Sequence, residues 1–321
     1  MLDTGSFPGW LEGVAFAMIA LGGSVVAWLR YGSRGATEKS VEFLPWSDRI
    51  YRAARGEYTA RARGQVAALT AADWPYAPGA LYAAYYGYPC NAVPVEGPEG
   101  EGARMLARDW SVGNRADLLA VLYRLLTRGH RVPYTADCRF YADMSEVDYR
   151  RWVHTGPDPA ELWRANAVRT NAGGMRHVHF LAWDLVRFVN VVCLGYRAGY
   201  LNRKEADSFV GLVAPPLQWA YAGWPDLWEN FLLGRRFWFA NRDDSEVTAL
   251  FSHLATLAVR TPGGPCKVLK WDTPLADGDP AAFIAAYREV PRLDENGQPL
   301  SAEAVASAVL DVIRPPGSAR V

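Results

Sequence analysis

The sequence predicts a mainly α-helical protein: an irregular multi-helix domain with a buried central helix, a small α+β extension at its carboxyl end and an N-terminal transmembrane helix. Three observations support this fold class. Apolar residues recur at helical spacing through the middle of the chain. One segment there is apolar on nearly every face, as buried helices usually are. Residues 13–29 form an uncharged apolar run near the amino terminus.

The apolar run GVAFAMIALGGSVVAWL, residues 13–29, has about the minimum length of a membrane-spanning helix. Trp10 and Trp28 stand near its ends, no Lys or Arg precedes it, and basic residues follow it. We therefore expect a membrane anchor over residues 1–30, in a single-pass protein of the inner (cytoplasmic) membrane with the bulk of the chain cytoplasmic. The alternative is a buried core helix, because the run is short and contains two adjacent glycines.

Residues 31–102 divide into a charged part and a part rich in Pro, Gly and Tyr. In the first part Ala54, Tyr58 and Arg61 keep a helical spacing, which predicts a juxtamembrane helix with a basic face. In the second part the turn-forming residues predict an irregular connection that contains one short helix around residues 81–86.

Residues 103–262 have the pattern of a helical domain. Its first clear helix follows Asn114, which can cap the amino terminus, and contains leucines at helical spacing. Gly129 is placed to end that helix, since glycine is common just past a helix terminus.

Two further helix starts follow in the same domain. Asn202 and Glu205 have the spacing of a capping box, and we expect their helix to stop at Pro215-Pro216. The next helix begins around Pro225, because proline suits the first turn of a helix.

Residues 263–321 form the predicted α+β extension. CKVLKW (266–271) has the composition of a short strand, whereas AAFIAAYREV (281–290) and AEAVASAVLDVI (302–313) have that of helices.

Three blocks of the chain carry a family likeness: DWSVGNRADLLAVLYRLLTRGHR, FLAWDLVRFVNVVCLGYRAGYLNRKEADSF and GWPDLWENFLLGRRFW. In order and spacing they resemble the DUF1266 family, a bacterial domain of unknown function, over roughly residues 105–240. The resemblance implies a mainly helical domain and no assigned activity.

The central block also contains the strongest candidate for a site. Between residues 180 and 196 the only charges are Asp184 and Arg187, three positions apart and therefore on one helix face. An unpaired buried charge costs several kcal/mol, so both charges need partners. The motifs at residues 129–131 (GHR) and 234–236 (GRR) are the expected sources.

Two interpretations of these charges are open. In the first they form a polar network that ties helices together. In the second His130, Asp184, Arg187 and Arg235 are catalytic residues, with Asp184 as a general base or a metal ligand and the arginines holding an anion. We favour the network, because buried ion-pair networks resemble active sites in their residue types.

Composition bears on whether the protein binds nucleic acid, a cofactor or a metal ion. Lys and Arg together number 34, as do Asp and Glu, so the net charge is zero and we expect no nucleic acid partner. The four cysteines form no CxxC pair, and His177 and His179 diverge on a helix without an identifiable third ligand. We therefore predict no cofactor and no metal ion.

The preferred hypothesis is a membrane-anchored protein, attached through residues 13–29, whose DUF1266-like domain binds a protein partner or a small ligand. The first alternative is an enzyme of hydrolase type that acts on a phosphate-containing substrate. The second alternative is a secreted effector or its immunity partner, for which the only sequence feature is the apolar amino-terminal segment.

Overall fold

The computed structural model describes residues 43–88, 100–177, 180–239, 245–276, 278–288 and 300–314. Within these ranges the chain forms α-helices and short 3-10 helices, and no strand. The mainly α-helical class is therefore confirmed.

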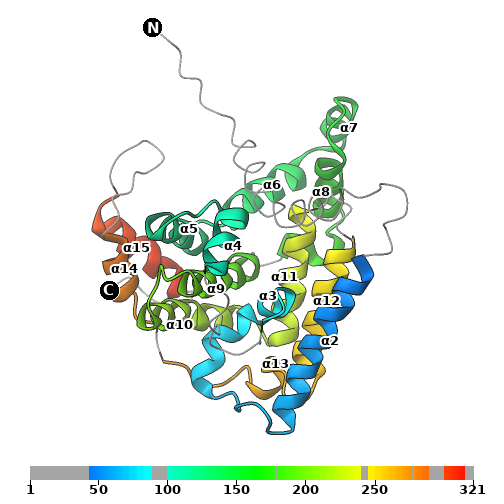
Figure 1. The fold of residues 1–321 in the computed structure, drawn as a ribbon. Coiled ribbons are helices and arrows are strands. Elements are labelled where there is room, and N and C mark those ends of the chain that lie inside the picture. The colour runs from blue at the N-terminus through cyan, green and yellow to red at the C-terminus, as the bar shows by residue number, and fades with distance from the viewer. Residues whose placement is uncertain are drawn as a thin grey trace.

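The helices are numbered as in Figure 1. In chain order they are α2 (Phe43–Ala62), η1 (Ala71–Gly79), α3 (Ala80–Tyr85), α4 (Glu101–Trp110), α5 (Arg115–Thr127), α6 (Arg131–Asp143), α7 (Glu146–His154), α8 (Pro159–Arg169), η2 (Ala172–His177), α9 (Leu181–Arg197), α10 (Arg203–Ala220), α11 (Trp224–Trp238), α12 (Ser245–Arg260), α13 (Pro265–Val268), α14 (Ala281–Arg288) and α15 (Ala302–Ile313).

Helix α9 lies at the centre of the molecule, with α4 and α5 on one side and α10 on the other (Figure 1). Every residue from 181 to 195 except Cys193 is buried. Gly234 lets α11 approach closely, since a Cβ atom added there would lie 2.9 Å from the Cβ atom of Trp183. The predicted buried central helix is confirmed.

The predicted helix starts are also confirmed. Asn114 accepts a hydrogen bond from the backbone N–H of Asp117 (3.0 Å) at the start of α5. Asn202 and Glu205 form a complete capping box at the start of α10. Each of these side chains satisfies backbone donors that a helix leaves unpaired in its first turn.

The predicted end of α10 was wrong, because the helix continues through Pro215 and Pro216 to Ala220. The two prolines deprive two carbonyls one turn earlier of their helical donors. The backbone at Gly278 packs against this part of α10, since a Cβ atom added to Gly278 would lie 2.9 Å from the carbonyl oxygen of Gly211. Burial against α9, η1, α14 and α15 outweighs the local helix-breaking tendency.

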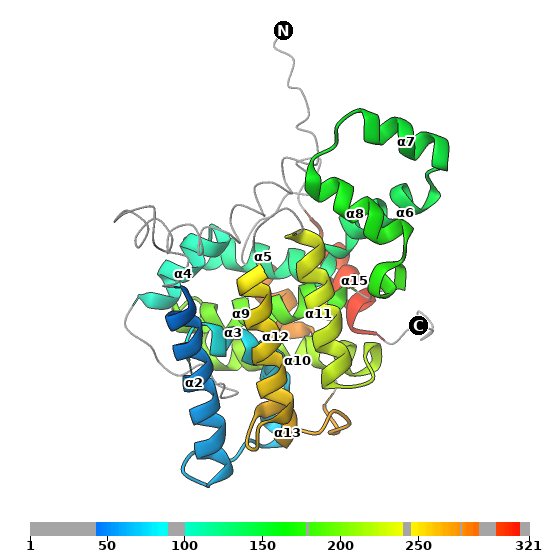
Figure 2. The ribbon, with the colours of Figure 1, turned by 90° about the vertical axis from the view of Figure 1, so that its right-hand side faces the viewer.

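The region between residues 43 and 88 belongs to the core. Helix α2 turns Ala54 and Tyr58 inward and runs beside α12 (Figures 1 and 2). Arg61 is buried too, and donates to Glu57 (2.8 Å) and to the carbonyl of Ala67 (2.8 Å). Trp74, in the predicted irregular connection, is fully buried. The short helix in that connection is α3, as predicted.

The prediction of an N-terminal transmembrane helix, and with it of a single-pass protein in the inner membrane, is corrected. Throughout the ranges described above, no helix combines the length and the apolar character needed to cross a membrane. Residues 13–29 themselves fall outside those ranges. The boundaries drawn at residues 102 and 262 stay predictions.

The α+β extension was also wrong. Residues 266–271, expected as a strand, begin inside the short helix α13 and continue as a turn. Side chains, rather than a neighbouring strand, donate to the carbonyls of the last residues of this segment. Trp224 donates to Leu269 (2.7 Å) and Trp74 to Lys270 (3.0 Å). The two helices predicted after it are confirmed as α14 and α15.

Helices α6, α7 and α8 form a lobe that projects from the body of the molecule (Figures 1 and 2). Helix α7 occupies its tip and has no buried residue. Helix α6 packs on α8, which in turn packs on η2. We call residues 131–169 the α6–α8 lobe.

Candidate functional site

The carboxylate of Asp184 caps a helix other than its own. Asp184 lies in the first turn of α9 and is 0 % exposed. It accepts hydrogen bonds from the backbone N–H groups of His130 (2.7 Å) and Arg131 (3.2 Å), where α6 begins. An anion at this place satisfies unpaired donors and faces the positive end of the helix dipole. Asp184 is therefore the amino-terminal cap of α6.

Gly129 makes room for this carboxylate. Its φ of +56° lies in the left-handed region that favours glycine. A Cβ atom added at Gly129 would lie only 1.9 Å from an Oδ atom of Asp184. The glycine predicted to end α5 thus also forms one wall of the pocket that holds the Asp184 carboxylate.

The side chain of Arg131 completes the junction. It pairs with Asp184 (3.0 Å) and donates to the last carbonyls of α5, at Leu125 (3.1 Å) and Leu126. The positive charge of Arg131 lies at the carboxyl end of α5, where the helix dipole is negative, and the negative charge of Asp184 lies at the amino end of α6, where the dipole is positive. Both placements are electrostatically favourable. Together Asp184 and Arg131 join the end of α5, the start of α6 and the first turn of α9.

Arg187 binds the imidazole of His130. One of its Nη atoms lies 2.9 Å from His130 Nδ1. Arginine has only donors, so Nδ1 accepts and the imidazole is neutral. Burial lowers the pKa of His130, the charge of Arg187 lowers it further, and Asp184 opposes this shift. The guanidinium of Arg187 also lies over the rings of Trp110 (4.7 Å) and Trp183 (4.9 Å).

We call His130, Arg131, Asp184 and Arg187 the Asp184 cluster. Three of the four predicted catalytic residues belong to it. The fourth, Arg235, is buried on α11 with its guanidinium over the rings of Phe239 (4.7 Å) and Phe251 (4.9 Å).

Arg235 has only a small electrostatic effect on Arg187. Burial lowers the pKa of Arg187, Tyr82 and Asp184 oppose this shift, and the positive charge of Arg235 adds slightly to it. Asp184 itself binds His130 and Arg131, as expected, but neither arginine of the GRR motif. The catalytic assignment of the four residues stays a prediction.

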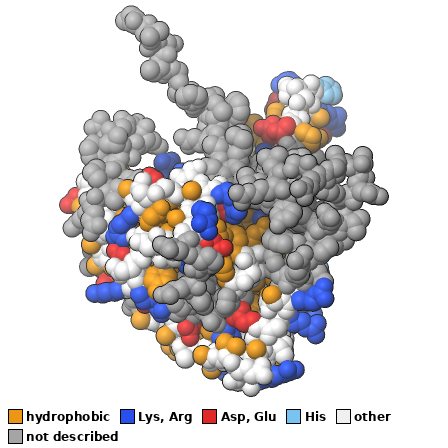
Figure 3. Space-filling view, viewed as in Figure 1, with side chains coloured by type: hydrophobic (Ala, Val, Ile, Leu, Met, Phe, Trp, Pro, Cys, Tyr) orange, Lys and Arg blue, Asp and Glu red, His pale blue; other side chains and the backbone are white. Residues whose placement is uncertain are grey.

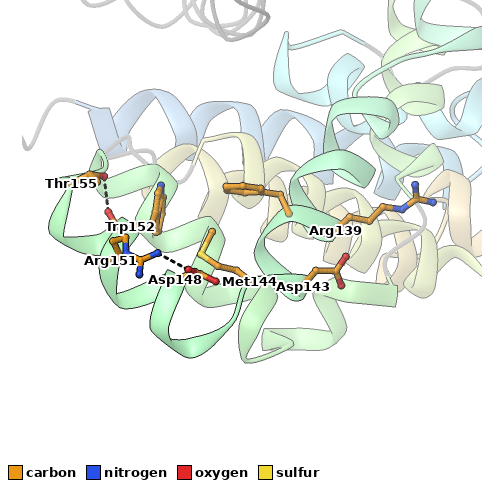
Figure 4. A pocket seen from close by; sticks show the side chains of 8 residues that line it. Arg139, Asp143, Met144, Asp148, Arg151, Trp152 and Thr155 are labelled. Carbon is orange, nitrogen blue, oxygen red and sulfur yellow. Dashed lines mark hydrogen bonds and ion pairs between the residues drawn. The ribbon is translucent and has the colours of Figure 1, made fainter.

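A cavity of about 590 Å³ lies elsewhere, in the lobe (Figure 4). Another cavity, of about 30 Å³, lies between α9 and the η1–α3 segment. No residue of the Asp184 cluster lines either cavity. The residues that line the cavity in the lobe include Arg139, Phe140 and Asp143 of α6 and Asp148, Arg151 and Trp152 of α7. We call this cavity the α6–α7 groove.

The groove has apolar side chains between charged ones. Phe140 is 57 % exposed. Trp152 is partly buried and packs against the ring of Tyr141 (5.7 Å between centroids), which holds α7 against α6. Asp148 and Arg151 form an ion pair of 2.9 Å at one end, and Arg139 and Asp143 extend away from it at the other (Figure 4).

Sequence reasoning missed this groove. Among the described residues, four large apolar side chains are clearly exposed, and three of these, Val132, Phe140 and Val147, lie on α6 and α7. The available signal was the inward stripe of α6, since Tyr134 and Tyr141 are seven positions apart and buried. Phe140 falls off that stripe, which predicts its exposure, but a single exposed aromatic residue does not by itself mark a contact surface.

The HxH pair considered as a metal site cannot be placed. Residue 179 and the side chain of His177 fall outside what the structure describes. In the part of the chain that it does describe, no group of three or more His, Cys, Asp and Glu side chains could hold a metal ion.

The fold and the Asp184 cluster together define an all-α domain in which one buried helix caps another through a single carboxylate. A family model described as a protein of unknown function (DUF1266) matches residues 105–271, and the chain belongs to this family. The match extends past the resemblance expected over residues 105–240 and reaches the turn after α13.

A curated relative is the uncharacterized protein YbeR of Escherichia coli (strain K12), which is 22 % identical over 152 residues. The alignment covers 43 % of this chain and 59 % of YbeR, so the chain spans less than two thirds of that relative. No solved structure matches the chain.

Proposed function

We propose that this DUF1266 protein is a binding protein and that the α6–α7 groove is the surface to which a partner protein docks. The observation that carries the proposal is the groove itself: an open cavity of about 590 Å³ with an exposed aromatic side chain, on a lobe that projects from the body. Exposed apolar residues that gather in one place commonly mark interaction surfaces. Aromatic and arginine side chains contribute much of the binding energy at such surfaces.

The Asp184 cluster supports this proposal over an enzyme. Its carboxylate is 0 % exposed and is occupied by donors from the start of α6. A general base has to reach the proton that it removes, either directly or through one water molecule. The bonds of Asp184 instead fix the position of α6.

Helix α6 links the cluster to the groove. It begins at His130 and Arg131 and ends with Arg139, Phe140 and Asp143 at the groove. Further along, Tyr134 stacks on Phe180 (3.7 Å between ring centroids) and donates to a carbonyl of η2, so the first turns of α6 are held rigidly. The cluster is in this view the anchor that orients the groove.

A photo-crosslinking residue placed at position 140 tests the proposal. We expect it to capture a defined partner protein in cells. The matched control is the same residue at position 268, because Val268 is 42 % exposed and lies on α13, far from the lobe (Figure 1). Equal labelling from the two positions, or none from position 140, would contradict the proposal.

A further inference from the structure

We infer that the protein docked in the α6–α7 groove is a second copy of this chain, so that two lobes associate about a two-fold axis. The inference rests on the proposed function, because it names the partner of the same groove. In a two-fold interface the same patch contacts itself, so the patch must be complementary to its own rotated copy.

The charges of the groove meet that requirement. Arg139 and Asp143 lie one turn apart on α6, and Asp148 and Arg151 lie on α7. The groove therefore carries two charges of each sign. A strongly acidic or strongly basic partner would meet as many repulsive as attractive charges there, whereas a second copy can pair opposite charges across the axis.

Two of these charges are available for pairing. Among the described residues, the side chains of Arg139 and Asp143 have no hydrogen bond and no ion pair. They stand on either side of Phe140 in the sequence and on the same helix. Each copy can therefore offer one unpaired cation and one unpaired carboxylate beside an exposed aromatic ring.

The apolar side chains suit the same arrangement. Phe140 is 57 % exposed in one copy, and the groove next to it contains Met144 and the partly buried Trp152. Rotation about a two-fold axis places the Phe140 ring of each copy over the groove of the other. Aromatic residues and Met are enriched at the centre of protein interfaces for the contact area that they supply.

The charge of the whole chain does not oppose association of two copies. Lys plus Arg and Asp plus Glu both number 34, so the net charge is zero. On the face shown in Figure 3, basic and acidic side chains are interspersed and no field of one sign covers it. Proteins with no net charge lack the long-range repulsion that keeps copies apart.

Charge reversal tests the inference directly. Arg139→Asp leaves the groove with three negative charges and one positive, and Asp143→Arg does the opposite. We expect the wild-type chain to dimerise in sedimentation velocity and light scattering, and each variant alone to dimerise at least about tenfold more weakly. An equimolar mixture of the two variants should dimerise again, because each acidic groove then meets a basic one.

The control is Lys267→Asp, which reverses an exposed charge on α13, outside the lobe. It should leave the dimer unchanged, and circular dichroism should show that all variants are folded. A wild-type chain that stays monomeric at every concentration, or variants that fail to recover in the mixture, would overturn the inference. If a monomeric chain still crosslinks a different protein through position 140, the inference fails while the proposed function stands. If position 140 crosslinks nothing, both fail.

Discussion

The two ends of α6 carry the same kinds of side chain in opposite environments. At its start, the buried Asp184 pairs with the partly exposed Arg131, next to the buried Arg187 and the ring of Trp183. At its end, Arg139 and Asp143 stand beside an exposed phenylalanine. Residue type alone therefore does not decide the role of these groups; burial and pairing do.

Each environment has a different physical consequence. The buried charges of the cluster have given up water, so removing one partner leaves the other without compensation. The charges of the groove remain hydrated and can exchange water for a partner at little energetic cost. Stability should therefore depend on the start of α6 and association on its end.

The largest effect on stability should come from Asp184→Ala. This change removes the cap of α6 and leaves the buried part of Arg131 without its carboxylate, for a loss of about 3–5 kcal/mol in the free energy of unfolding. Urea denaturation measures this loss. Asp143→Ala, at the other end of α6, is the matched control and should change the free energy by less than about 0.5 kcal/mol. Similar losses in both variants would mean that the start of α6 contributes no more to stability than its end.

A smaller loss is expected from Gly129→Ala. Alanine would be strained in the left-handed backbone conformation of this residue. Its Cβ atom would also lie 1.9 Å from an Oδ atom of Asp184 and would displace the carboxylate. Gly156→Ala is the control, since Gly156 has a φ of +73° and no atom within 4 Å of the added Cβ. The control should lose about 1 kcal/mol from backbone strain, and Gly129→Ala about 1 kcal/mol more through the weakened cap. Equal losses in Gly129→Ala and Gly156→Ala would show that Gly129 does not contribute to the capping of α6 by Asp184.

A pH dependence should follow from His130. Burial and the charge of Arg187 lower its pKa in the folded state, so the unfolded chain binds the proton more readily. Stability is then fully present above the ordinary histidine pKa of about 6.5 and falls as the pH drops from there towards the lowered value. Thermal unfolding at several pH values measures the slope.

The control for this pH dependence is His130→Asn. Its amide oxygen can still accept from Arg187, and it does not titrate. The variant should lose the histidine contribution to the slope between neutral and mildly acidic pH. An unchanged slope would assign the pH dependence to other groups.

Much of the body could be predicted from sequence because its signals are local. The caps at Asn114 and Asn202 and the apolar faces of α9 depend on residues a few positions apart. The buried Asp184 could also be predicted to need donors from another element, and of the two motifs expected to supply them, GHR and GRR, the structure shows GHR. These features could be predicted because the pattern of neighbouring residues defines the helices, and because a buried charge is unstable without hydrogen-bonding partners.

The errors arise where long-range packing outweighs local pattern. Pro215 does not end α10 because other elements cover that helix. Residues 266–271 form no strand because tryptophans from distant segments satisfy their carbonyls. The groove was missed for a related reason, since an exposed Phe140 is a signal only once the packing of α7 against α6 is known.

The smallest effect on stability should come from Phe140→Ser, which nevertheless should have a large effect on association. An exposed side chain that packs little contributes within about 0.5 kcal/mol to the free energy of unfolding, whereas the loss of a central aromatic residue at an interface costs 2 kcal/mol or more, roughly thirtyfold in affinity. Urea denaturation and sedimentation velocity on the same preparation measure the two quantities. Should Phe140→Ser unfold as easily as Gly129→Ala, the ring belongs to the core of the lobe, and the two ends of α6 serve one purpose. A stable variant that no longer associates separates them, with the start of α6 fixing the lobe and its end selecting the partner.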